Sequence, residues 1–161
     1  MNLGKAAQTL VEYWRAQGLS LPAGCDREAI GNFERAHRVA LPAEMSAYLM
    51  FADGMQQTFR DAWDKDGFAF YPLSAIGSVP EIGQRYNPPL ARFSSDEDFF
   101  IFADYLQVSW SYAIRLRGEG NRIVIVGKEI PEIVAESFQE FVALYVTGSK
   151  RLYAGTAASD P

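Results

Sequence analysis

Residues 26–54 read DREAIGNFERAHRVALPAEMSAYLMFADG, and this stretch decides the fold. It predicts two short amphipathic helices joined at Leu41-Pro42. Asp26 is a favourable N-cap for the first helix, because its carboxylate accepts a hydrogen bond from an otherwise unpaired backbone N–H. Pro42 suits the first position of the second helix, since its missing N–H would have no partner there. Gly54 suits a left-handed turn that ends this helix. Helices this short are marginal alone, so we expect each to pack on a partner surface.

Apolar side chains recur at helical spacing along both predicted helices, and they mark the faces that we expect to be buried. The first stripe is Ile30, Phe33 and His37, and the second is Met45, Tyr48, Leu49 and Ala52. His37 is the sole histidine of the chain. We interpret it as a ring packed at a helix end, where the helix dipole favours its positive form, and not as a catalytic base.

The rest of the sequence indicates further helices near both ends and several strands between them. Period-2 or β-branched patterns predict strands, and apolar stripes with caps predict helices. We expect helices over 4–17, 78–86 and from Ser137 to Gly148, and strands over 68–73, 99–103, 108–116 and 123–126. The last helix begins with a capping box formed by Ser137 and Glu140. The order predicts an α+β fold, an antiparallel sheet of about four to six strands with helices packed on one face.

The length of 161 residues predicts a single domain over residues 1–150, followed by a flexible C-terminal tail over 151–161. The chain is 48% hydrophobic and 14% aromatic, which favours a globular core and excludes general disorder.

The formal net charge is −5. An acidic surface disfavours nucleic acid or an anionic membrane as a partner, because both attract a basic face. Cys25 is the only cysteine, so no disulfide forms within the chain. The first residues lack the pattern of a signal peptide, and no apolar run has the length of a membrane helix. We therefore expect a cytoplasmic protein that binds neither nucleic acid nor membrane.

Two acidic runs are the candidate functional residues. They consist of Asp61, Trp63, Asp64 and Asp66, and of Asp96, Glu97 and Asp98. One interpretation is that of solvated turns, which favour Asp. The other is an acidic rim around an aromatic anchor, an arrangement that binds a basic protein. Carboxylates this close in sequence could also form an acid–base pair like that of a glycosidase.

Other catalytic and metal-binding arrangements find little support. A single His and a single Cys leave only an all-carboxylate site for a hard cation. Asp64-Lys65-Asp66-Gly67 matches part of a calcium loop, but Ala62 and Leu73 stand at the first and last ligand positions. We expect no cofactor and no metal ion.

An ordered set of short motifs carries a family resemblance. The set is Glu28 with Ile30, Phe33-Glu34, Leu41-Pro42, Tyr48-Leu49 and Asp53-Gly54, followed near the end by Ala135, Ser137, Phe138 and Phe141. It resembles the SMI1/KNR4-like domain of the SUKH superfamily, over residues 25–146. The resemblance implies an antiparallel sheet after a helical opening. It also implies a noncatalytic binding module, because the family is best known for bacterial immunity proteins that neutralise cognate toxins, many of them nucleases.

Three hypotheses for function follow. The first is an immunity protein that binds a basic, nuclease-type toxin encoded nearby. The second is a scaffold or regulatory domain that binds a host protein and has no toxin partner; a neighbouring toxin gene would distinguish the two. The third, a hydrolase that uses the clustered carboxylates, is the weakest of the three, and we do not expect an enzyme.

Overall fold

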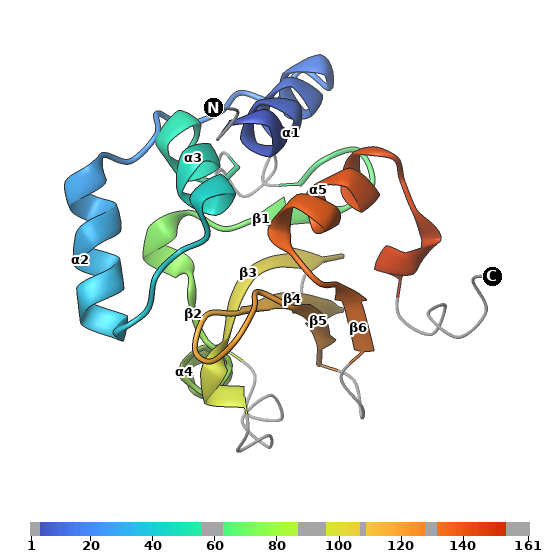
Figure 1. The fold of residues 1–161 in the computed structure, drawn as a ribbon. Helices are drawn as coiled ribbons and strands as arrows, with labels where there is room; N and C mark the ends of the chain where they lie inside the picture. The colour runs from blue at the N-terminus through green and yellow to red at the C-terminus, as the bar shows by residue number, and fades with distance from the viewer. Residues whose placement is uncertain (1–3, 56–62, 87–95, 107–108, 128–131, 154–161) are drawn as a thin grey trace.

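Most of the helices of this protein pack on one face of an antiparallel sheet (Figure 1). The computed structural model describes residues 4–55, 63–86, 96–106, 109–127 and 132–153. The helices are α1 (Lys5–Ala16), α2 (Arg27–His37), α3 (Ala43–Phe51), α4 (Val79–Tyr86) and α5 (Phe138–Val146), with short 3-10 helices η1 (Leu73–Ala75), η3 (Asp96–Asp98) and η4 (Lys150–Leu152). The strands are β1 (Phe68–Phe70), β2 (Gly77–Ser78), β3 (Phe99–Tyr105), β4 (Trp110–Arg115), β5 (Ile123–Val126) and β6 (Glu132–Ala135).

The sheet has the order β1-β3-β4-β5-β6, and β2 also pairs with β3. Every pairing among the described strands is antiparallel, so the predicted α+β class and the β3-β4-β5 meander are confirmed. The register pairs Phe99 with Arg115 at one end of β3 and Tyr105 with Trp110 at the other. These two ends of β3 carry the two candidate regions.

The main core lies between the sheet and α1, α2, α3 and α5. Its largest fully buried side chains are mostly aromatic: Trp14, Tyr48, Tyr112, Phe70, Phe100, Phe102, Phe138 and Phe141. Phe33 is 8% exposed and Tyr48 is 0% exposed, so both predicted core positions are confirmed. A smaller cluster on the other face joins Val79 and Ile82 of α4 to Ile101 of β3. His37 packs its ring against Phe33 and Phe100, as the helix-end interpretation expects.

The segment that follows β1 corrects two predictions. The strand predicted over 68–73 ends at Phe70, and the chain turns into η1 at Leu73. The turn arises because Pro72 has no N–H for a ladder and because the Asp53 carboxylate accepts the Leu73 N–H at 2.7 Å. Helix α3 ends at Phe51 with Ala52 extended, so Gly54 does not end it.

Gly54 instead allows two backbone segments to approach each other closely. Its φ is +75°, and a Cβ there would lie 2.6 Å from the Pro72 nitrogen. The backbones of the α3–β1 connection and the β1–η1 connection therefore meet at Gly54, where only glycine combines this φ with this approach.

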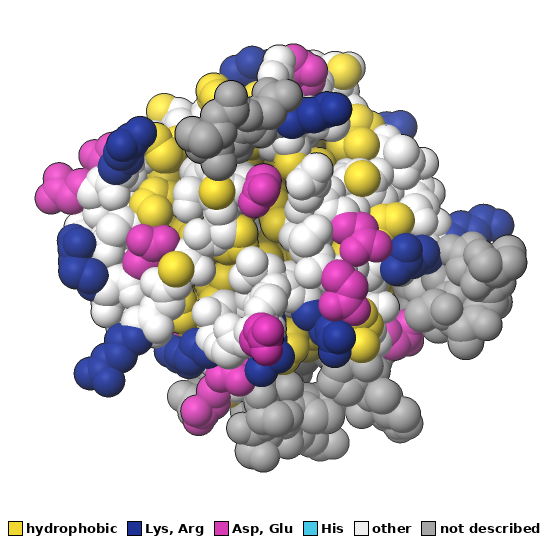
Figure 2. Space-filling view, in the orientation of Figure 1, with side chains coloured by type: hydrophobic (Ala, Val, Ile, Leu, Met, Phe, Trp, Pro, Cys, Tyr) yellow, Lys and Arg dark blue, Asp and Glu magenta, His cyan; other side chains and the backbone are white. Residues whose placement is uncertain are grey.

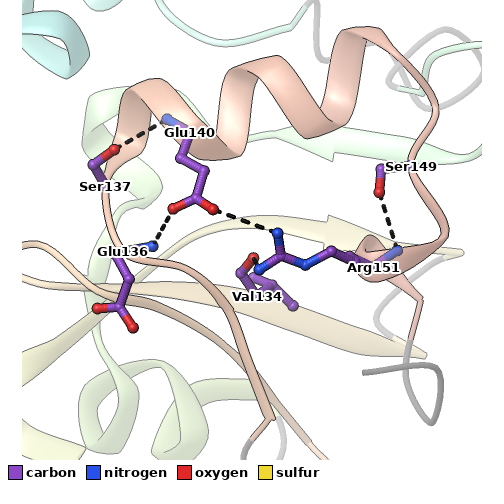
Figure 3. A network of polar contacts seen from close by, with 6 residues as sticks. All are labelled: Val134, Glu136, Ser137, Glu140, Ser149 and Arg151. Carbon is purple, nitrogen blue, oxygen red and sulfur yellow. Dashed lines mark hydrogen bonds and ion pairs between the residues drawn. The ribbon is translucent and has the colours of Figure 1, made fainter. Parts of the chain in front are cut away.

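Helix α5 has the predicted cap, with a shift of one residue (Figure 3). The Ser137 hydroxyl accepts the Glu140 N–H at 3.0 Å. The Glu140 carboxylate reaches the N–H of Glu136 at 2.8 Å, one residue before the Ser137 N–H that a capping box uses. Arg151 then connects the cap to the sheet, since its guanidinium contacts Glu140 at 3.5 Å and donates to the Val134 carbonyl at 3.2 Å.

The C-terminal segment packs for a few residues beyond the predicted boundary at 150. Leu152 is 1% exposed, and its carbonyl accepts the Tyr112 hydroxyl. Residues 154–161 lie outside the described part of the chain. Strands β2 and β6 are not predicted from the sequence. The two residues of β2 are too few to establish a period, and β6 lacks the continuous β-branched run that indicates β5.

Candidate protein-binding surface

The loop 63–67 is held in place by one of its acidic residues. Asp64 is 6% exposed, and its Oδ1 accepts the N–H groups of Asp66 and Phe68, each at 2.9 Å. Its Oδ2 accepts the hydroxyl of Tyr145 on α5. The Trp14 Nε1–H of α1 donates to the same hydroxyl at 3.1 Å. Asp64 is thus turned into the protein, and it connects the loop to two helices.

The electrostatics of this network keep the Tyr145 hydroxyl protonated, so that it acts as a hydrogen-bond donor. Burial first, and the Asp64 carboxylate next, raise the pKa of Tyr145 far above its ordinary value. The phenol therefore stays protonated, and its O–H donates a hydrogen bond to the Asp64 carboxylate. A second hydrogen bond joins the loop to the end of α1: the side-chain carbonyl of Gln17 accepts the Lys65 N–H at 3.0 Å.

The outer side of this loop forms a shallow hollow of about 350 Å³. Trp63 is half-buried, whereas Lys65 and Asp66 are exposed. Leu106, which follows β3, completes the hollow and is 51% exposed. The Leu106 N–H donates to the Gly67 carbonyl at 2.9 Å, so loop and strand end are joined. We call Trp63, Asp66 and Leu106 the loop surface: an indole and an exposed leucine beside a carboxylate.

The second acidic run has different surroundings. Residues Asp96–Asp98 form η3, directly before β3. The Asp98 carboxylate lies 3.9 Å from Arg115. Glu97 is exposed, and its carbonyl accepts a hydrogen bond from Arg117 at 2.6 Å. Arg115 therefore offsets part of the negative charge of this run.

The structure does not bring the two acidic runs together. They lie beyond opposite ends of β3, and six residue steps of a strand at about 3.3 Å each separate them by about 20 Å. An acid–base pair needs its carboxylates within about 10 Å, so no such pair forms between Asp64 or Asp66 and Glu97 or Asp98. Asp61 falls outside the described residues.

Leu106 is the residue of the loop surface that the sequence analysis misses. It has a positive φ of 46°. The available signal is an apolar residue in a chain reversal, where Gly, Asn or Asp is usual. Its neighbours carry no period that would indicate exposure.

Two features are absent from the described part of the chain. No group of three or more His, Cys, Asp or Glu side chains there is placed to hold a metal ion. None of the helices described is both long enough and apolar enough to cross a membrane.

Comparison with protein families gives one match: the model of the SMI1 / KNR4 family (SUKH-1) matches residues 24–144. The chain belongs to this family. A search of curated proteins finds no match. The family motifs of this SMI1/KNR4 domain have structural tasks, as Glu34 illustrates: its carboxylate accepts the Leu41 N–H at 2.8 Å and fixes the α2–α3 connection. The connection to η1 is fixed by the Asp53 carboxylate, which accepts the Leu73 N–H, and by the close backbone approach at Gly54.

Proposed function

We propose that this SMI1/KNR4 domain is a noncatalytic immunity protein that binds and neutralises a basic, nuclease-type toxin through the loop surface. The observation that carries the proposal is the exposure of Leu106 and Asp66 beside Trp63, on a loop that Asp64 fixes internally. Interfaces of this kind gain most of their energy from a few aromatic or apolar anchors within a polar rim. A preordered loop also loses little conformational entropy on binding.

The charge of the protein supports a basic partner. The formal net charge is −5, and opposite charges accelerate encounter more than they strengthen the final complex. A nuclease must be basic where it binds its substrate. Membership of the SMI1/KNR4 family also agrees with a protein-binding role. An acidic protein that covers a basic groove would block the substrate and so neutralise the toxin.

The test is co-expression with the product of the adjacent gene, followed by measurement of both rate constants at two salt concentrations. We expect Trp63→Ala to raise the dissociation rate, with a loss of about 2 kcal/mol. Asp66→Lys should slow association and reduce its salt dependence, because exposed charges act through a field that salt screens within about 10 Å at 0.1 M.

The matched control is Glu97→Lys, which reverses another exposed acid, at the other end of β3. If Glu97→Lys slows association as much as Asp66→Lys, only the net charge matters and the loop surface is wrongly chosen. If the adjacent product is harmless to cells and the protein binds it without salt dependence, the immunity proposal fails and a scaffold role takes its place.

A further inference from the structure

A second hollow, of about 520 Å³, lies at the end of the sheet opposite the loop surface. It is formed by the C-terminal end of α2 and by the turn that follows β4, and we call it the arginine hollow. Its lining includes Arg35, Arg38, Arg117, Glu34, Val39 and Leu116. Lys and Arg side chains gather at the lower left of Figure 2, where Figure 1 places the C-terminal end of α2.

Among the residues that the structure describes, none of the three arginines of the arginine hollow forms an ion pair with a carboxylate. Arg117 donates to two backbone carbonyls, that of Glu97 at 2.6 Å and that of His37 at 2.7 Å. Arg35 donates to the side-chain carbonyl of Asn32 at 2.6 Å. These oxygens satisfy N–H donors but carry no full charge, so both guanidinium groups keep their positive field.

Arg38 is the most available of the three. It is exposed, and its guanidinium contacts no acceptor among the residues that the structure describes. Three other described arginines have carboxylate partners: Arg115 with Asp98, Arg122 with Glu136 and Arg151 with Glu140. The hollow brings three such unpaired arginines together, and their summed positive field would attract an anionic group.

The backbone at Arg38 supports the same inference. Arg38 is the C-cap of α2, with φ 55° and ψ 49°, in the left-handed region. Glycine is the usual residue at this kind of helix end, because a side chain strains the backbone there. Strained residues of this kind cluster at functional sites.

We propose that the arginine hollow binds an acidic segment of a protein partner. Arg35 and Arg38 would hold its carboxylates with paired N–H groups, and Arg117 would add a fixed positive charge. Val39 and Leu116 give the same hollow an apolar side for a neighbouring aliphatic side chain. The proposal is independent of the proposed function, because it uses the opposite end of the sheet.

The surroundings favour carboxylates of a short segment over a nucleic acid backbone. Glu34 lies in the lining, and Glu97 and Asp98 lie beside Arg117 and Arg115. A polyphosphate chain needs a continuous basic track, and these acids interrupt it. A short acidic segment needs only the few arginines of the hollow.

The experiment is a titration of the full chain with a capped hexapeptide of alternating glutamate and leucine, followed by NMR of the backbone amides. We expect saturable shifts confined to 31–40 and 116–118, which weaken as salt is added. The lysine–leucine peptide of the same length should give none. Arg35→Ala should weaken binding by about tenfold.

Arg38→Gly is the decisive variant, because it removes the side chain and also relieves the left-handed backbone. We expect it to retain or raise the melting temperature while it weakens peptide binding by about tenfold. Arg27→Ala, an exposed arginine at the other end of α2, is the matched control and should change nothing. Absence of saturable shifts, equal binding by Arg38→Gly, or tighter binding of a single-stranded oligonucleotide would each overturn the proposal.

Discussion

At the scale of single residues, Gly54 shows how one backbone position joins two segments. We expect Gly54→Ala to lower the free energy of unfolding by about 2 kcal/mol or more, because a left-handed φ and a backbone clash act together. The Cβ would meet the Pro72 nitrogen at 2.6 Å. Gly18→Ala is the control: its φ is +78°, but nothing lies within 4 Å of the added Cβ, so a loss of about 1 kcal/mol is expected. Equal losses in urea denaturation would contradict the role of the close approach.

The Cys25 thiol gives a prediction that depends on pH. Burial first, and the Asp53 carboxylate next, raise its pKa from 9.0 to about 11. The neutral thiol donates to the Leu49 carbonyl at 3.3 Å, which ties the start of α2 to α3. We expect iodoacetamide to alkylate Cys25 slowly at pH 8 in the folded protein and quickly in urea, because the thiolate is the nucleophile.

The sign of the linked stability change follows from the same pKa. A pKa that is raised on folding stabilises the protein fully below about pH 9, and this contribution disappears as the pH rises through about 11. Cys25→Ala should therefore flatten the fall in stability between these two values. An alkylation rate at pH 8 that is the same with and without urea would show that the thiol is not protected.

At the scale of elements, α2 depends on a narrow apolar stripe. Phe33 is 8% exposed and packs edge-on against Phe100 of β3 at a centroid distance of 6.2 Å. We expect Phe33→Ala to cost about 3–5 kcal/mol in chemical denaturation, because the cavity adds to the lost burial. Arg27→Ala, on the exposed side of the same helix, should cost less than about 0.5 kcal/mol. A loss below about 1 kcal/mol for Phe33→Ala would mean that α2 is not held by this contact.

The sequence predicts the helices and central strands well, and the edges of the sheet less well. Caps such as Asp26 and Ser137 act within a few residues, so local chemistry identifies them. The end of β1 depends on Asp53, which lies 20 residues from its partner Leu73 in sequence. Pro72 is a local signal for the turn, but the pairing of Asp53 with Leu73 has none, so the sequence alone predicts too long a strand.

The candidate site shows the same limit. The Asp64-Lys65-Asp66-Gly67 turn does not reveal which carboxylate points inward. The choice depends on Tyr145, which is 81 residues from Asp64 in sequence. The sequence therefore identifies the loop as a candidate, and the fold alone separates the internal Asp64 from the exposed Asp66.

At the scale of the whole molecule, the two candidate surfaces lie beyond opposite ends of β3. The loop surface, with Trp63, Asp66 and Leu106, lies beyond one end of β3. The arginine hollow lies beyond the other, where β4 leads into Arg117. A separation of about 20 Å exceeds the Debye length of about 8 Å at physiological salt, so the two fields do not cancel. Under the two proposals, a protein with a net charge of −5 would offer one surface to a basic partner and another to an acidic partner.

Helix α1 lies outside residues 24–144, which the family model matches, yet it completes the core. Trp14 is 0% exposed and contacts Phe70 and Tyr48 edge-on, with centroid distances of 5.1 and 6.0 Å. We expect Trp14→Ala to cost about 3–5 kcal/mol, as for other large buried aromatics. Trp14→Phe keeps a ring but removes the donor to Tyr145, so its loss should be nearer 1 kcal/mol.

Urea denaturation followed by far-UV circular dichroism measures both losses without relying on Trp14 fluorescence. Glu12→Ala, an exposed residue of the same helix, is the control and should change stability by less than about 0.5 kcal/mol. Because the Trp14–Tyr145–Asp64 chain also holds the loop surface, Trp14→Ala should make the amides of 64–68 exchange faster than those of β5. If Trp14→Ala costs under 1 kcal/mol and the exchange stays uniform, α1 is an appendage and the matched segment is stable without it.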